Sequence, residues 1–233
     1  MRRAFSLGTL ENRIEVSLPQ DVLSLSLQGT HVDHEDERVK DFLLALGNVY
    51  RDEEGEVVDW YDDSGKVITQ LPRRFVHDHN LLHRGIGALI LSNSGGEAFM
   101  HMRSKRKRTW PGLKDCLIGG INTAGQSGAQ TLARELKEEI GLDIAQEKNA
   151  PTVSFLGQCR IATSQNQCIV DVYCVRLGVP PCGAAPELNY ADGEVEWGKW
   201  VPVKELQDMI NEDESAFVPS GLQVWRFIES LKL

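Results

Sequence analysis

The sequence predicts an α/β fold, and three features carry this prediction. Residues 85–91 form a nearly continuous apolar run, which is typical of a central buried strand. In residues 168–177, apolar and polar side chains alternate as they do in a half-buried strand. Between these two segments, apolar residues recur at helical spacing and indicate an amphipathic helix with one buried stripe, made of Ala129, Leu132, Ala133, Leu136 and Ile140.

The composition is that of an ordinary globular protein: of 233 residues, 41% are hydrophobic and 25% charged. No apolar run approaches the roughly 20 residues that cross a bilayer, so we expect no membrane association. The net charge of -9 argues against a nucleic-acid partner, because such proteins usually carry a basic face. Five cysteines without a Cys-x-x-Cys motif indicate reduced thiols and a cytoplasmic location. The opening Met-Arg-Arg leaves organelle targeting as the less favoured alternative.

Residues 1–79 are predicted to form an N-terminal extension and residues 80–233 the main domain. Within the extension, alternation at 23–27 predicts a short strand and the apolar face at 39–46 a helix. Residues 56–72 predict a β-hairpin with its turn at 62–65. Further strands are predicted at 98–102, 153–160 and 194–201, and helices at 203–209 and 221–231.

The amphipathic helix has recognisable ends and an acidic face. Ser127 can cap its first turn, and Gly141 stands where a helix needs a left-handed residue to end. Glu135, Glu138 and Glu139 stand at i, i+3 and i+4, so their carboxylates share one face beside the apolar stripe.

A solvated acidic face is the first alternative for such a cluster of glutamates. Two features favour a site instead. The cluster adjoins the apolar stripe, and it follows a turn predicted at Gly119 and Gly120 and a loop of small residues. Oxygen ligands beside a flexible loop are what Mg²⁺ or Mn²⁺ binds, with substrate phosphates completing the shell. The sequence therefore predicts a divalent metal site.

The sequence here resembles the Nudix box, which is a Gly, five residues, a Glu, seven residues and then Arg-Glu-aliphatic-any-Glu-Glu-any-Gly-aliphatic. The box opens at Gly120, and its tail fits from Arg134 to Leu142 without a mismatch. The early glutamate is Gln126 instead, which leaves the number of bound ions open. The resemblance covers about residues 56–231. It implies the Nudix fold, a mixed β-sheet sandwiched between helices, and a hydrolase that cleaves a diphosphate with Mg²⁺ or Mn²⁺.

The resemblance also implies roles for the residues of the box. Glu138 and Glu139 would be the principal metal ligands, and Gly120 is counted among the metal-binding residues. Glu135 would be a further ligand or the base that activates water. Arg134 would hold the carboxylates in place.

The lead-in to the box resembles one Nudix branch, which includes isopentenyl-diphosphate isomerase and hydrolase-like relatives. The resemblance rests on the hairpin, then His77, and then Asn-Leu-Leu-His-Arg, which contains His83. The isomerases bind a metal with histidines in this region and use a catalytic Cys and a third His after a Pro-Gly turn. Leu117, Ile118 and Gly119 occupy that place here. We therefore interpret both histidines as structural or at a pocket rim, and an isomerase as the weaker alternative.

Residues 103–108 place five cations in six positions of an otherwise acidic protein. A solvated loop and a nuclear import signal are the alternatives to a binding role. The same Nudix branch carries an Arg, three residues, a Lys, three residues and Pro-Gly, which Arg103, Lys107 and the Pro-Gly at 111–112 match. Arg103 and Lys107 are therefore predicted to bind substrate phosphates. Trp110 beside them can stack on a base or pack the loop.

Two glutamates near Trp200 and one histidine are the remaining candidates. Members of the family often place a glutamate six residues before a tryptophan such as Trp200, where it helps to bind metal or activate water. Glu194 fits this place, Glu196 competes with it, and surface charge is the alternative for both. His101, inside a predicted strand, is interpreted as a satisfied strand residue rather than a catalyst.

Together these patterns predict a metal-dependent pyrophosphohydrolase that cleaves a small-molecule substrate, a nucleoside diphosphate or one linked to another moiety. An isopentenyl-diphosphate isomerase-type enzyme and a non-catalytic nucleotide-binding module, which Gln126 makes conceivable, are the alternatives. The sequence does not decide between a monomer and a homodimer, and it assigns no role to residues 1–50.

Overall fold

The computed structural model describes residues 5–7, 14–16, 55–145, 151–177, 188–190 and 193–232. The strand expected at 23–27 and the helix expected at 39–46 lie outside these residues. The chain divides into two compact units. The first comprises Met1–Arg84, Thr123–Gly125 and Ser164–Gln167, and the second comprises Gly85–Asn122, Gln126–Thr163 and Cys168–Leu233.

The first unit contains the predicted hairpin. Its described elements are β1 (Phe5–Leu7), β2 (Ile14–Val16), β3 (Val57–Tyr61), β4 (Val67–Pro72) and α3 (Arg73–Asp78). Strands β1 and β2 pair antiparallel, as do β3 and β4, so the hairpin at 56–72 is confirmed. Its turn is closed by Asp62, whose Oδ1 accepts hydrogen bonds of 2.9 Å from the backbone N–H groups of Ser64 and Lys66. Helix α3 was not predicted, because six residues are too few to display a helical period.

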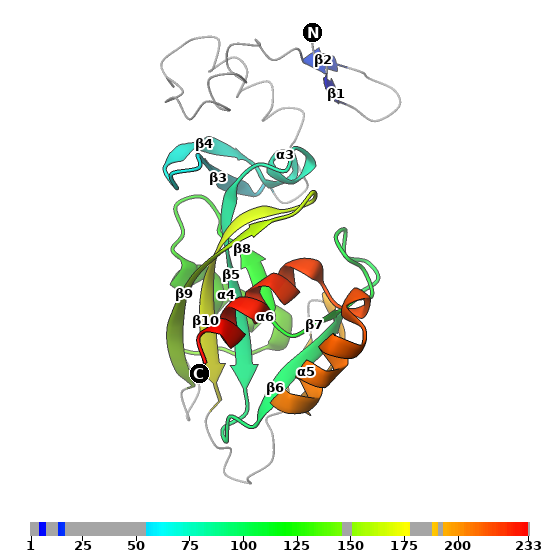
Figure 1. Ribbon diagram of the computed structural model, residues 1–233. Helices are drawn as coiled ribbons and strands as arrows, with labels where there is room; N and C mark the ends of the chain where they lie inside the picture. The colour runs from blue at the N-terminus through cyan, green and yellow to red at the C-terminus, as the bar shows by residue number, and fades with distance from the viewer. Residues whose placement is uncertain are drawn as a thin grey trace. The chain divides into compact units, whose positions relative to one another are not determined.

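The second unit is built on a seven-stranded sheet. Its strands are β5 (His83–Leu91), β6 (Glu97–Arg103), β7 (Lys114–Asp115), β8 (Ile118–Ile121), β9 (Thr152–Ala162), β10 (Gln167–Arg176) and β11 (Val195–Pro202). The strand order is β11-β6-β5-β10-β9, with β7 paired to β6 and β8 paired to β5 (Figure 1). The long strands that the sequence predicted are therefore confirmed.

The prediction of a turn at Gly119 and Gly120 is wrong. Both glycines lie within β8, which pairs antiparallel with β5 and sets Gly119 opposite Gly87. A Cβ atom on Gly85 of β5 would lie only 2.6 Å from the carbonyl oxygen of Gly120. The glycines thus permit a close approach of two strands, a role that glycine also has in sheets and that the dipeptide alone does not distinguish from a turn.

Helix α4 (Gly128–Ile140) has the ends that the sequence predicted. Ser127 and Gln130 form a reciprocal capping box at its start. Gly141 ends it with φ of 71°, in the left-handed region that glycine adopts without strain. Leu132, Leu136 and Ile140 of its apolar stripe are buried in a core cluster with side chains of the sheet, among them Ile86, Phe99 and Ile118. The other two members of the predicted stripe are not buried, since Ala129 is exposed and Ala133 half-buried.

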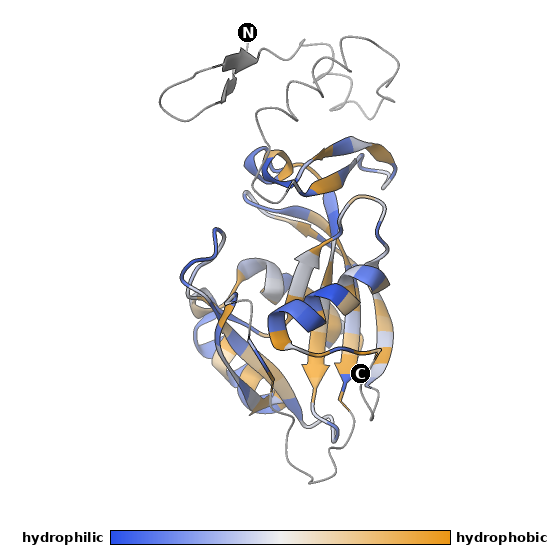
Figure 2. Ribbon diagram, turned by 180° about the vertical axis from the view of Figure 1, so that it is seen from behind, coloured by the Kyte–Doolittle hydropathy of each residue, from blue (hydrophilic) through white to orange (hydrophobic). Residues whose placement is uncertain are grey.

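The opposite face of the sheet is covered by α5 (Val203–Glu212) and α6 (Pro219–Ser230), which a short 3-10 helix, η1 (Glu214–Ala216), connects (Figure 1). A second core cluster lies on this side and includes Met100, Leu206 and Trp225. The unit is thus a sheet between two helical layers. The outward face of α4 is hydrophilic (Figure 2). None of the helices in the described part of the chain has the length and apolar character needed to span a bilayer.

Candidate active site

The acidic face of α4 combines carboxylates in very different surroundings. Glu139 is 2% exposed and Glu135 is 8% exposed, because both lie beside the buried apolar stripe. The side chain of Glu138 is 52% exposed. Buried carboxylates are rare unless they are paired, so the partners of Glu135 and Glu139 decide what the site can do.

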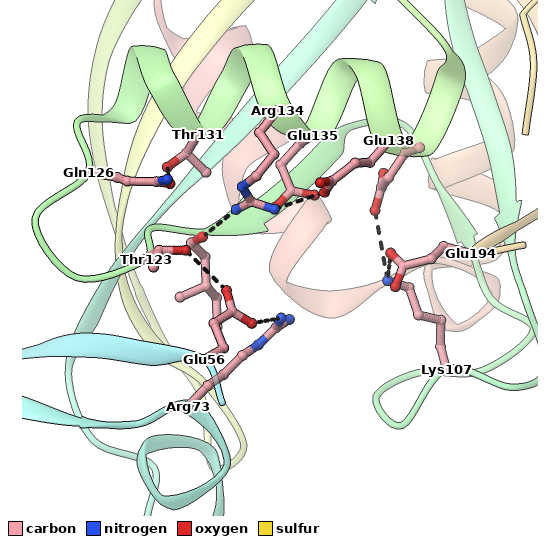
Figure 3. Close-up of polar contacts among 12 residues, drawn as sticks. Glu56, Arg73, Lys107, Thr123, Gln126, Thr131, Arg134, Glu135, Glu138 and Glu194 are labelled. Carbon is pink, nitrogen blue, oxygen red and sulfur yellow. Dashed lines mark hydrogen bonds and ion pairs between the residues drawn. The ribbon is translucent and has the colours of Figure 1, made fainter. Parts of the chain in front are cut away.

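Arg134 connects two of these carboxylates to the sheet (Figure 3). One guanidinium nitrogen, NH1, lies 2.8 Å from Glu135 Oε1 and 2.9 Å from Glu138 Oε2. The other, NH2, donates a hydrogen bond of 3.1 Å to the carbonyl oxygen of Ile121 at the end of β8. The planar guanidinium thus joins the helix face to the strand, and the expectation that Arg134 holds the carboxylates in place stays a prediction.

Gly120 provides the space that Glu135 occupies. A Cβ atom on Gly120 would lie 2.0 Å from Glu135 Oε1 and 2.1 Å from its carboxyl carbon. Any side chain at this position would therefore displace the carboxylate. The close contact places the backbone of β8 directly beside the acidic face.

Lys107 brings together two carboxylates that lie far apart in the sequence (Figure 3). Its Nζ atom lies 3.8 Å from Glu139 Oε1 and forms a shorter ion pair with Glu194 Oε2. The backbone N–H of Ser104 donates a hydrogen bond of 2.8 Å to the carbonyl oxygen of Glu194 and holds this segment in place. Glu196, the competing candidate, is exposed. The structure thus places Glu194, and not Glu196, beside the acidic helix.

The electrostatics of Glu139 are dominated by its burial, which raises the pKa of its carboxyl well above the usual range. The ammonium of Lys107 is the largest opposing influence and lowers this pKa, while Glu135 and Glu194 raise it further. The carboxyl of Glu139 therefore holds its proton more firmly than an exposed glutamate does, and the charge of Lys107 offsets part of this effect.

His101 and Arg103 lie two residues apart on β6 and so share one face of the strand. Burial, reinforced by the charges of Arg103 and Lys107, lowers the pKa of His101 to about 3, so its imidazole is neutral at pH 7. His101 lies in the strand interior as expected, but its Nδ1 has no hydrogen-bond partner among the described residues, so it is not the satisfied histidine that the sequence suggested. Arg103 NH2 donates a hydrogen bond of 3.3 Å to the carbonyl oxygen of Thr109.

Trp110 follows in the same cationic loop and has a strained backbone. Its φ is 49°, a left-handed conformation that is unusual for a bulky side chain and costs about 1–3 kcal/mol. Gly112 N–H donates a hydrogen bond of 3.1 Å to the carbonyl oxygen of Arg103 and closes the loop. The loop thus holds Arg103, Lys107 and Trp110 in one short, hydrogen-bonded segment.

Among the residues that the structure describes, no group of metal-binding side chains lies around the histidines of the lead-in. His83 is 2% exposed, and its Nδ1 lies 2.9 Å from the carbonyl oxygen of Leu81. Burial lowers the pKa of His83, and its ring centroid lies 5.5 Å from that of His77. These contacts agree with the structural interpretation of His83.

Sequence reasoning missed the carboxylates that hold the loop of the box. Within the first unit, Asp59 Oδ2 accepts a hydrogen bond of 3.0 Å from the backbone of Gly125. Glu56 accepts one of 3.3 Å from Thr123 Oγ1 and one of 2.6 Å from Arg73 (Figure 3). No local pattern marks the contacts with Thr123 and Gly125, because these partners lie more than 60 residues away along the chain.

The described residues contain no group of three His, Cys, Asp or Glu side chains arranged as a ready-made metal site. Instead, these carboxylates form ion pairs. Arg134 pairs with Glu135 and Glu138, and Lys107 pairs with Glu139 and Glu194. Their oxygens are nevertheless the hard donors that Mg²⁺ and Mn²⁺ prefer. The donor chemistry therefore fits a divalent ion that shares these carboxylates with the two side-chain cations. Gln126, at the departing position of the box, accepts a hydrogen bond of 3.5 Å from Thr131 Oγ1 instead.

The site is thus an acidic helix face and a cationic loop, on a sheet between two helical layers. Residues 81–220 match the sequence model of the NUDIX domain family, and the chain belongs to this family. It is accordingly a hydrolase that acts on diphosphate bonds.

The chain is similar to relatives named as hydrolases and to relatives named as isomerases. An uncharacterized Nudix hydrolase of Rhodococcus erythropolis is 28% identical over 171 residues, which are 71% of this chain and 88% of the relative. An isopentenyl-diphosphate Delta-isomerase of Paenarthrobacter aurescens is 28% identical over 179 residues, 75% of this chain and 92% of the relative. A crystal structure from Deinococcus radiodurans has a TM-score of 0.59 at 21% identity, covers 73% of this chain and 98% of its own, and shows the fold alone.

Proposed function

We propose that this hydrolase is a Mg²⁺- or Mn²⁺-dependent pyrophosphohydrolase of a nucleoside diphosphate or a nucleoside diphosphate linked to another moiety. The observation that carries the proposal is Glu139, a nearly fully buried carboxylate set beside Glu135 and paired with Lys107. Burying an acid without use would destabilise the fold, so the position argues for a functional cation at this end of α4.

The acidic face supplies the metal ligands of the proposed site. Glu138 and Glu139 are the principal ligands, Glu135 is a further ligand or the base that activates water, and Gly120 is counted with them because Glu135 lies against it. A bound divalent ion supplies charge stabilisation for the diphosphate and lowers the pKa of a water molecule.

Two carboxylates beside the principal metal ligands, Glu135 and Glu194, are proposed to transfer protons. Glu135 is the proposed base that takes the proton of the attacking water, and Arg134 fixes its orientation through the 2.8 Å ion pair. Glu194 is the second proposed catalytic carboxylate. Its ion pair with Lys107 places it beside Glu139.

Arg103 and Lys107 are the proposed phosphate-binding residues. Cations placed across from the metal ligands neutralise the charge that develops as the P–O bond breaks. The neutral imidazole of His101 adds no charge between them. Trp110, in the same loop, is proposed to contact the group attached to the diphosphate, since strained backbone is often retained at binding sites.

The relationship to an isomerase makes isomerisation the second candidate activity. Moving a double bond requires groups that donate and accept protons, and Leu117, Ile118 and Gly119 offer none where the isomerases carry a Cys and a His. The nearby Cys116 is 1% exposed in the core, and burial raises the pKa of its thiol. These observations favour hydrolysis.

The test is cleavage of nucleoside diphosphates, triphosphates, dinucleotides and nucleotide sugars, with Mg²⁺ and with Mn²⁺, measured as release of inorganic phosphate or pyrophosphate or, for substrates substituted at both ends, of nucleoside monophosphate. Release that depends on the metal and is lost in Glu139→Gln would support the proposal and identify the substrate class. Nucleotide binding without release would support a non-catalytic module. Conversion of isopentenyl diphosphate, followed by product analysis, would support the isomerase.

A further inference from the structure

Lys107 lies between two carboxylates that come from different elements. Its Nζ atom contacts Glu194, which immediately precedes β11, and lies 3.8 Å from Glu139 on α4. The side chain of Lys107 is only 18% exposed, so water screens these attractions weakly. The ammonium thus holds together two carboxylates that would otherwise repel one another.

A divalent ion competes with this ammonium for the same oxygens. Mg²⁺ and Mn²⁺ coordinate carboxylate oxygens directly, and no ion can bridge Glu139 and Glu194 while an ammonium lies between them. An ammonium has three N–H donors. One of them is donated to Glu194, and the attraction to Glu139 across 3.8 Å is ionic, so N–H donors remain for a substrate phosphate.

The charges of these ion pairs also support a competition between Lys107 and a divalent ion. Glu135 and Glu138 share the guanidinium of Arg134, as Glu139 and Glu194 share Lys107. Removing Lys107 would take one positive charge from beside Glu139 and Glu194, so a divalent ion would be attracted to these carboxylates more strongly.

We propose that Lys107 takes the place of one divalent ion between Glu139 and Glu194, so that the site binds one metal ion fewer than its carboxylates would hold without it. The inference rests on the proposed function, because it treats these carboxylates as metal ligands. The lysine supplies a charge that cannot dissociate, on the side of the site where the phosphates are proposed to bind.

The test counts the Mn²⁺ ions bound per chain, from the electron paramagnetic resonance signal of free Mn²⁺ during a titration. Lys107→Met, which removes the charge at similar volume, is expected to bind one ion more than the wild type. Lys107→Arg keeps the charge and is expected to bind the wild-type number. Lys105→Met is the matched control, because Lys105 is an exposed lysine of the same loop.

A double variant locates the additional ion. Adding Glu194→Gln to Lys107→Met is expected to return the count to that of the wild type. An unchanged count in Lys107→Met, or an additional ion that persists without Glu194, would overturn the proposal. If Lys107→Met does not fold, Lys107→Gln is read in the same way, because its amide can still donate a hydrogen bond to a carboxylate.

The outcome separates this inference from the proposed function. Metal-dependent hydrolysis with the same ion count in wild type and Lys107→Met overturns the inference alone. A wild-type protein that binds no Mn²⁺ and hydrolyses no diphosphate overturns both.

Discussion

Glu138 and Glu139 are neighbours in the sequence, but the structure gives them opposite surroundings. Glu138 is half-exposed and pairs with Arg134 one helical turn away, a kind of ion pair that contributes about 0–1 kcal/mol. Glu139 is buried and pairs with Lys107 from a distant loop. A buried charge depends on its partner, and loss of that partner destabilises by about 3–5 kcal/mol. The ion pairs of these two glutamates therefore differ in the free energy that they contribute to stability, although both residues belong to one motif. Substituting the two residues should have different consequences.

Glu139→Gln should have the largest effect on activity. Removing a proposed principal metal ligand should lower kcat by about 10³-fold or more, equivalent to roughly 4 kcal/mol. Thermal unfolding in EDTA should show equal or higher stability, because a neutral amide replaces a carboxyl that burial holds at a raised pKa. Steady-state rates and unfolding curves measured together check both halves, and a fully active variant would remove Glu139 from the site.

Gly120→Ala should come next, at about a 10²-fold loss of kcat. The new Cβ would meet Glu135 Oε1 at 2.0 Å and displace the proposed base. Gly119→Ala is the matched control, because its Cβ would lie 3.4 Å from the nearest atom, the carbonyl oxygen of Ile86. Equal activities of the two variants would mean that the contact between Gly120 and Glu135 has no bearing on catalysis.

Glu138→Gln should have a smaller effect than either. A ligand that is half-exposed and already shared with Arg134 should change the rate by about tenfold and raise the metal concentration needed for half-maximal activity. Stability should change by less than about 0.5 kcal/mol, as at most surface positions. A loss as large as that of Glu139→Gln would erase the distinction between the two glutamates.

Asp115→Asn should leave activity nearly unchanged and alter only the dependence of stability on pH. Asp115 is a buried carboxyl outside the proposed ligands, and burial raises its pKa from 3.8 to about 6. Between these values the unfolded chain loses this proton while the folded chain keeps it, so stability falls as pH rises from about 4 to about 6. The variant lacks this loss and should be more stable than wild type by about 1–3 kcal/mol at pH 7, but not at pH 3.5.

Urea unfolding of the two proteins at both pH values measures this difference. The substitution keeps an oxygen that can accept the 3.2 Å hydrogen bond from the N–H of Leu117. A difference in stability that does not depend on pH would show that Asp115 does not titrate in the folded protein as its burial implies.

The parts of the site that depend on local sequence were predictable. Ser127, Gly141 and the acidic face of α4 follow from capping chemistry and helical spacing, which need only neighbouring residues. The family resemblance added Arg103, Lys107 and Glu194 as candidates for roles that experiment must still test.

The rest depends on contacts that no local pattern encodes. The ion pair of Lys107 with Glu194 joins residues 87 positions apart, and it exists only because the fold brings loop and strand together. The placement of Gly120 inside β8 was mispredicted for a related reason. Glycine serves both turns and close strand contacts, and only the tertiary structure tells them apart.

The central claim is that the buried carboxylate Glu139 holds the metal on which hydrolysis depends. The most direct test is the dissociation constant of Mn²⁺, measured by electron paramagnetic resonance for the wild type and for Glu139→Gln. We predict that Mn²⁺ binding weakens at least about tenfold in Glu139→Gln, in parallel with its loss of phosphate release. Equal affinities in the two proteins would contradict it.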